Sequence, residues 1–126
     1  SKLAQMMFGY ELQRRVEAAG KDVVVQVCHP GASRTNLISG DVSTLNKILI
    51  RLMKPFFQSA ERGSWPEVLC ATEADVKSET LYGPTKRADT VGPVGECPLE
   101  AHALDRDAAG RLWEISETKT GLTWSP

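Results

Sequence analysis

Few side chains in this sequence have the type and spacing that chemistry requires. Cys28 and His29 are adjacent, but neighbours on a strand point to opposite faces and cannot pair as nucleophile and base, so His29 is expected to serve a turn or line a pocket wall. The three cysteines, Cys28, Cys70 and Cys97, are widely separated and form no CxxC pair, and the two histidines lack metal-ligand spacing. We therefore expect no metal site, and reduced cysteines that pack as small side chains.

The run VVVQVCHPG, residues 23–31, predicts a strand that ends in a loop suited to ligand binding. Its nearly continuous valines are typical of a strand over residues 23–27 that is buried on both faces, as in a parallel sheet. Pro30 and Gly31 end the strand. Ligands of open α/β sheets bind outside the carboxyl ends of the strands, and the hydroxyl of Thr35 can bond an amide there. An ordinary strand-to-helix turn is the alternative interpretation.

Helices are expected where apolar residues recur at helical spacing. Gly20 and Gly121 are natural terminators, because glycine takes a left-handed conformation without strain, and Asp105 is a suitable N-cap. Pro55 ends or kinks the helix before it. The four expected helices cover residues 3–19, 44–54, 59–72 and 105–119.

The sequence predicts only two strands, which is too few for a parallel sheet. The second strand, ETLYGP, is expected to stop at Gly83 and Pro84, and the glycines and prolines of residues 85–98 predict a long irregular loop. A strand buried on both faces needs a neighbour on each edge to pair its amides and carbonyls. We therefore expect further strands from a missing N-terminal half or from another chain, and we expect that the chain does not fold stably alone.

The composition is ordinary for a globular protein, and it argues against nucleic acid as a partner and against a segment that spans a bilayer. Hydrophobic residues make up 41% and charged residues 25% of the chain, with a formal net charge of −1. No global basic field favours nucleic acid, and no apolar run is long enough to span a bilayer. A cytoplasmic location is the expectation.

Four stretches, taken in order, resemble the C-terminal half of the short-chain dehydrogenases/reductases. They are SK opening an apolar helix, VVVQVCHPGASRT, LYGP and GRLWEISETKTG. The tail, from PEVLCATEAD to RLWEISE, is most similar to the retinol-dehydrogenase-like and protochlorophyllide-reductase-like members. The resemblance implies an α/β fold, the C-terminal portion of a Rossmann-type doubly wound parallel sheet. Residues 1–126 would then be part of a single NAD(P)-binding domain, without its N-terminal dinucleotide-binding half.

The resemblance also implies an oxidoreductase that moves a hydride between NAD or NADP and an alcohol or carbonyl of an apolar substrate. Lys2 would be the catalytic lysine of a Tyr-x-x-x-Lys motif, lowering the pKa of the phenol and bonding the nicotinamide ribose. Pro30, Gly31 and Thr35 would contact the nicotinamide and its carboxamide. The tyrosine would precede Ser1 and the catalytic serine would lie upstream, so the chain alone is expected to be inactive. From the residues alone, a solvated side chain in a first helical turn, with Ser1 as N-cap, is the favoured interpretation of Lys2.

The expected helix over residues 44–54 and the residues after it carry a strong apolar stripe beside several basic residues. In the family this region covers the substrate, so the resemblance implies an apolar lid. The predicted substrate-pocket residues are Leu49, Leu52, Met53 and Phe56. Core packing and an anionic membrane surface are the alternatives, and the membrane is not favoured. The alternative function is a non-enzymatic interaction module that docks a partner through residues 44–57.

Overall fold

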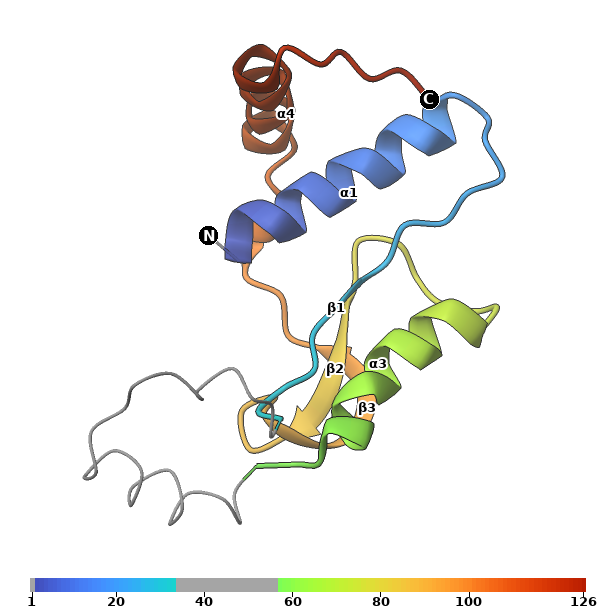
Figure 1. Cartoon of the computed structure of the whole chain (residues 1–126), viewed down its shortest axis with the longest axis vertical. Helices are drawn as coiled ribbons and strands as arrows, with labels where there is room; N and C mark the ends of the chain where they lie inside the picture. Colours follow the sequence, from blue (N-terminus) through green and yellow to red (C-terminus); the bar gives the residue numbers. More distant parts are fainter. Residues whose placement is uncertain (1, 34–56) are drawn as a thin grey trace, which may run out of the picture. The chain divides into compact units, whose positions relative to one another are not determined.

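The structure is a computed structural model that describes residues 2–33 and 57–126. The chain divides into two compact units, the first made of Ser1–Val27, Ala74–Leu81 and Pro98–Pro126 and the second of Cys28–Glu73 and Tyr82–Cys97. The elements in chain order (Figure 1) are α1 (Lys2–Ala18), β1 (Val27–Cys28), α3 (Ala60–Thr72), β2 (Leu81–Lys86), β3 (Val91–Cys97), the 3-10 helix η3 (Ala101–Leu104) and α4 (Arg106–Thr120). The assignment of the whole chain to one NAD(P)-binding domain stays a prediction.

Three of the expected helices are confirmed, and their ends follow the signals in the sequence. α1 is followed by Gly20, whose φ is +64°, and α4 is closed by Gly121, whose φ is +68°. The Asp105 carboxylate accepts a hydrogen bond from the Ala108 amide at 2.9 Å and so caps α4. α3 begins after Ser59, as expected. The helix expected over residues 44–54 lies outside the described residues.

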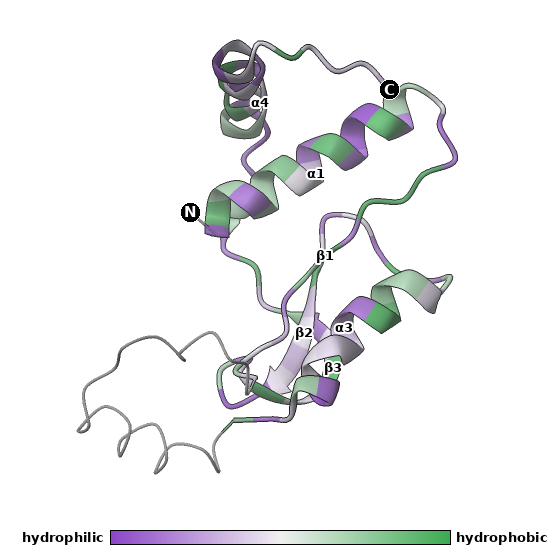
Figure 2. Cartoon of the chain, viewed as in Figure 1, coloured by the Kyte–Doolittle hydropathy of each residue, from purple (hydrophilic) through white to green (hydrophobic). Residues whose placement is uncertain are grey.

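The first unit is built on the packing of α1 against α4 and η3. Phe8 stacks on Trp113 with ring centroids 4.6 Å apart, and the Arg15 guanidinium lies 4.5 Å from the same ring. Tyr10 and Val16 of α1 are buried with Trp113. Figure 2 shows hydrophobic and hydrophilic residues alternating around α1, in keeping with a helix that buries only part of its circumference.

The second unit contains a three-stranded mixed sheet in the order β1-β2-β3, with α3 packed against β3. Tyr82, Gly83 and Pro84 in the middle of the sheet are buried. This sheet and its helices confirm the predicted α/β class.

The prediction of a doubly buried strand over residues 23–27 is wrong for this structure. β1 contains only Val27 and Cys28, while the side chains of Val23 and Val24 are 53% and 65% exposed. β1 stands at an edge of the sheet and pairs with β2 alone. The valine run therefore has the composition of a central strand but, in the described part of the chain, has no second neighbour to bury it.

The predicted irregular loop over residues 85–98 is also wrong, as is the stop at Gly83 and Pro84. β2 continues through both residues to Lys86, and β3 covers most of the remaining segment. Pro93 is tolerated because β3 is an edge strand, where an amide facing outward is not needed for pairing. The connecting turn contains three consecutive non-glycine residues with positive φ: Arg87, Ala88 and Asp89. Turn residues of these types gave no clear hairpin signal in the sequence.

Candidate functional site

The predicted ligand loop is a closely held turn of the second unit. Residues 30–33, here called the 30–33 turn, directly follow the carboxyl end of β1. The His29 amide donates to the Tyr82 carbonyl at 2.9 Å, and the Ala32 amide donates to the Thr90 carbonyl at 2.7 Å. The turn is therefore tied to β2 at its start and to the β2–β3 connection at its centre.

Gln58 fastens the turn from a distant part of the sequence. Its side-chain Nε2 donates to the Pro30 carbonyl at 2.6 Å, and its amide donates to the Ala32 carbonyl at 3.0 Å. The Ser33 hydroxyl donates to the same Pro30 carbonyl at 2.9 Å, and Ser33 forms a parallel bridge with Gln58. Gln58 is only 7% exposed, and its Oε1 is buried without a hydrogen-bond partner. Sequence reasoning missed Gln58, because its contacts join segments that no local pattern relates.

Gly31 is required at its position for two independent reasons. Its φ of +64° lies in the left-handed region, which side chains rarely adopt. In addition, a Cβ atom at Gly31 would lie 2.5 Å from the Thr90 carbonyl oxygen and would overlap Pro84 Cγ. The backbone of the turn thus packs directly on the β2–β3 hairpin, and no side chain fits between them.

His29 serves the turn rather than a thiol–imidazole pair. Its Nδ1 accepts a hydrogen bond from the Gly31 amide at 3.3 Å. The other side of the ring occupies the space that a Cβ at Gly83 would need, 2.5 Å from His29 Cδ2. The imidazole is therefore wedged between the turn and β2, and the missing side chain of Gly83 makes room for it.

Lys2 is the first residue of α1 and is exposed. It belongs to the first unit, whereas Pro30 and Gly31 belong to the second. Thr35 and the predicted substrate-pocket residues Leu49, Leu52, Met53 and Phe56 lie outside the described residues. The structure therefore brings Pro30 and Gly31 together in one turn, and the roles of all these side chains stay predictions.

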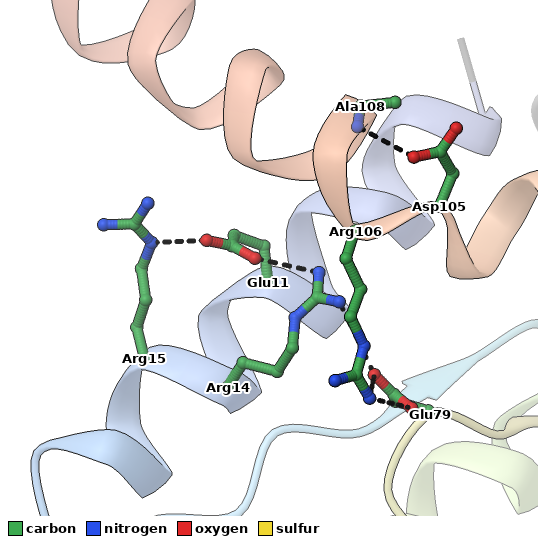
Figure 3. A network of polar contacts seen from close by, with 7 residues as sticks. All are labelled: Glu11, Arg14, Arg15, Glu79, Asp105, Arg106 and Ala108. Atoms are coloured by element: carbon green, nitrogen blue, oxygen red, sulfur yellow. Dashed lines mark hydrogen bonds and ion pairs between the residues drawn. The ribbon is translucent and has the colours of Figure 1, made fainter.

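A polar network secures α1, the helix that carries Lys2 (Figure 3). Glu11 binds Arg14 and Arg15, each at 2.8 Å, within the helix. Glu79 joins α1 to α4, because its carboxylate lies 3.6 Å from Arg14 Nη1 and 3.3 Å from Arg106 Nη2. Pairs as exposed as that of Arg106 contribute little, typically about 0–1 kcal/mol. The network therefore adds little to the stability that the packing of α1 on α4 provides.

Tyr10 is the buried titratable group of α1. Its hydroxyl has no hydrogen-bond partner, and burial, reinforced by the negative charge of Glu79, raises the pKa of Tyr10 to about 12. A phenol in this state holds its proton at neutral pH, so Tyr10 is unsuited to exchange protons with a substrate. Tyr10 is a packing residue of the first unit.

The described residues give no indication of a metal centre or a membrane span. In 2–33 and 57–126, no three His, Cys, Asp or Glu side chains gather where they could hold an ion. Over the same residues, every helix is too short or too polar to cross a bilayer.

Comparison with known proteins links the chain to oxidoreductases. Retinol dehydrogenase 14 from Homo sapiens is 35% identical over 126 residues, covering 97% of this chain and 34% of its own length. Retinol dehydrogenase 12 from Mus musculus is 29% identical, with 98% and 36% covered. A short chain dehydrogenase/reductase from Gibberella zeae is 30% identical over 119 residues, with 93% and 32% covered. No protein-family model matches the chain.

A solved structure shares the fold. An uncharacterized protein from Mycobacterium paratuberculosis superimposes with a TM-score of 0.68 and 27% identity, covering all of this chain and 39% of its own. The chain spans about a third of the length of the curated relatives described above. The resemblance to the short-chain dehydrogenases/reductases is confirmed by these relatives, and the shared fold supports a partial Rossmann-type α/β architecture.

Proposed function

We propose that the protein containing this chain transfers a hydride between NAD or NADP and an alcohol or carbonyl group of an apolar substrate. In this proposal the chain contributes the 30–33 turn to the nicotinamide site and Lys2 to proton transfer. The names of the relatives support the proposal, since retinol is an apolar alcohol and both retinol dehydrogenases cover nearly the whole chain.

The observation that carries the proposal is the 30–33 turn itself. It leaves the carboxyl end of β1, where ligands of open α/β sheets bind. The preceding His29 amide donates to β2, the Ala32 amide donates to the β2–β3 connection, and Gln58 donates to two carbonyls of the turn, so the position of the turn is fixed before a ligand arrives. Pro30 is exposed and Gly31 has no side chain to obstruct a flat ring.

The residues at the turn fit a nicotinamide. Its carboxamide carries N–H donors, and Gln58 Oε1 is a buried acceptor without a partner beside Pro30. When bound, the nicotinamide ring supplies the position that gives or takes the hydride. Pro30 and Gly31 would form the wall against the ring, and Thr35, which follows the turn in sequence, would orient the carboxamide as the family resemblance implies.

Lys2 would act on a proton rather than on the hydride. A positive ammonium one helical turn from a phenol favours the phenolate and lowers the phenol's pKa toward neutrality. A phenol tuned in this way can take the proton from an alcohol or return it to a carbonyl oxygen. Lys2 is exposed in the first turn of α1.

The test is the Lys2→Ala substitution, made in the full-length protein that contains this chain. Turnover of retinol with NADP and with NAD should fall by on the order of a hundredfold or more, because a positioned proton-transfer partner is lost. Lys21→Ala is the control, since Lys21 is also an exposed lysine, lies beyond the C-terminal end of α1, and should leave turnover unchanged. Near-normal turnover of a well-folded Lys2→Ala variant would contradict the assigned role.

Cofactor binding provides a separate check on the turn. Quenching of intrinsic fluorescence by NADH and NADPH reports binding without any chemical step. Gln58→Leu keeps the volume at Gln58 but removes both the donor to Pro30 and the buried acceptor. We expect it to weaken binding of at least one of the two cofactors, and unchanged binding of both would place the nicotinamide elsewhere.

A further inference from the structure

The LYGP motif at the start of β2 lies directly against the 30–33 turn and the residue before it. The Tyr82 carbonyl accepts a hydrogen bond from the His29 amide at 2.9 Å. The His29 imidazole fills the space beside Gly83, and Pro84 Cγ occupies the place that a Cβ at Gly31 would need. The motif is therefore shaped to receive both His29 and Gly31.

The His29 imidazole is bonded to the turn through one ring nitrogen. Its Nδ1 accepts a hydrogen bond from the Gly31 amide at 3.3 Å. A ring nitrogen that accepts a hydrogen bond carries no proton, so the neutral imidazole has its proton on Nε2. Among the described residues, the Gly31 amide has this one acceptor. The Pro30 carbonyl, by contrast, has two donors, Gln58 Nε2 and the Ser33 hydroxyl.

We propose that His29 is a positioning residue for nicotinamide binding, which holds the Gly31 amide and thereby sets the backbone wall against which the ring packs. The proposal rests on the function proposed above, because it needs a nicotinamide at the 30–33 turn. His29 acts through Gly31 rather than by touching the ring itself.

The physical reason lies in the backbone freedom of glycine. Gly31 has no side chain to restrict its conformation, so its contacts must do so. Without Nδ1 the Gly31 amide loses its acceptor, and the peptide group between Pro30 and Gly31 can rotate. A wall that has to be ordered when the cofactor arrives weakens binding, because the cost of ordering is then subtracted from the binding free energy.

Gly83 is needed for space and not for its backbone conformation. A Cβ there would lie 2.5 Å from His29 Cδ2, and its three nearest atoms all belong to this imidazole. Gly83 is not among the described glycines with positive φ, so the backbone allows a side chain at this position. Gly83→Ala would therefore displace the imidazole while leaving His29 chemically unchanged.

The experiment compares two substitutions of His29 in the full-length protein that contains this chain. His29→Asn keeps an acceptor, because an asparagine oxygen readily bonds the amide two residues further on. His29→Leu has nearly the same shape as His29→Asn but no acceptor. Calorimetric titration measures the dissociation constant of NADH or NADPH, whichever binds more tightly, and that of the matching ADP-ribose fragment, which lacks the nicotinamide ring.

We expect the acceptor, and not the imidazole as such, to decide cofactor affinity. His29→Leu should raise the dissociation constant of the cofactor by about two- to tenfold, as the loss of one neutral hydrogen bond does. It should leave the ADP-ribose fragment nearly unaffected, and His29→Asn should leave both ligands nearly unaffected. A purely structural role would instead change the two ligands alike, or neither.

Two further measurements address the seat and the tautomer of His29. Gly83→Ala should weaken cofactor binding by a factor similar to that of His29→Leu. Gly95→Ala is the control on the other strand of the hairpin, because a Cβ there meets Thr85 Cγ2 at 3.0 Å and no atom of His29. Nitrogen NMR of the imidazoles at alkaline pH, with the His29 signals identified by their absence from His29→Asn, should show a proton on Nε2 and none on Nδ1.

The outcomes separate the role of His29 from the proposed function. A proton on Nδ1, equal cofactor affinity of the His29→Leu and His29→Asn variants, or equal weakening of cofactor and ADP-ribose fragment would each overturn the role of His29. If the unsubstituted protein binds the cofactor no more tightly than the fragment, the nicotinamide site itself is wrong, and the proposed function and the role of His29 fall together.

Discussion

Replacing Gly31 by alanine is the most direct test of how the 30–33 turn is built. The substitution adds a single methyl group to a residue whose φ is +64°. It also places that methyl 2.5 Å from the Thr90 carbonyl oxygen and into Pro84 Cγ. Both neighbours belong to the β2–β3 hairpin, so the clash is with backbone and a proline ring, which cannot rotate away. Either the turn or the hairpin must therefore move.

The two effects have separate magnitudes. A left-handed conformation costs an L-residue with a Cβ about 1–2 kcal/mol relative to glycine. Inserting a methyl into a closely packed contact costs about 1–3 kcal/mol more, because backbone has to shift. We therefore expect Gly31→Ala to lower the free energy of unfolding by about 2–5 kcal/mol. That is a large fraction of the stability of a small domain, about 5–15 kcal/mol.

Gly20→Ala separates the two contributions. Gly20 has the same φ of +64°, but a Cβ there would meet nothing within 4 Å. Only the conformational cost of about 1–2 kcal/mol should remain. Urea unfolding of the protein containing this chain, followed by circular dichroism, measures both variants. If Gly31→Ala costs no more than Gly20→Ala, the turn does not pack on the hairpin as described, and the rigid nicotinamide wall fails with it.

Substitutions at three further positions test the packing of the first unit, each by urea unfolding. Gly110→Ala should raise the free energy of unfolding by about 0.5–1 kcal/mol, because Gly110 lies inside α4 with open space at its Cβ. Asp105→Ala should lower it by about 1 kcal/mol through loss of the cap on Ala108, whereas Asp105→Asn should change it little. For Tyr10, the unfolded chain releases its proton near the ordinary pKa of 10.0 and the folded chain near about 12, so stability should fall as the pH rises between these values. Tyr10→Phe should remove that decline and cost nothing at neutral pH, since the hydroxyl has no partner; an unchanged alkaline profile would refute the assignment.

The helices could be predicted from the sequence because their signals are local. Ser59 accepts a hydrogen bond from the Arg62 amide at 3.2 Å and Asp105 caps α4, each at the start of an apolar pattern. Gly20 and Gly121 take the left-handed conformation that ends a helix. All these contacts join residues within one helical turn, so a short window of sequence contains both partners.

The strands were harder to predict than the helices, because the residues that pair in a sheet are far apart in the sequence. The hairpin of β2 and β3 was missed since its glycines and prolines are also typical of loops, and only the edge position of β3 makes Pro93 compatible with a strand. Gln58 was not predicted because its hydrogen-bond partner Pro30 is 28 residues away in the sequence. By contrast, the turn at Pro30 and Gly31 could be predicted because a proline–glycine pair after a valine run is a local pattern, and the binding role of these two residues stays a prediction.

The valine run shows why its composition predicted a buried strand that the structure does not contain. Adjacent β-branched residues are typical of strands with neighbours on both sides, yet Val23 and Val24 are largely exposed here. In the described residues, β1 has β2 on one side only. The Val25 amide is satisfied by the Gln13 side chain of α1 at 2.5 Å instead of by a strand. The Gln13 side chain thus takes the place of a neighbouring strand as hydrogen-bond acceptor for Val25. It does not bury the side chains of Val23 and Val24.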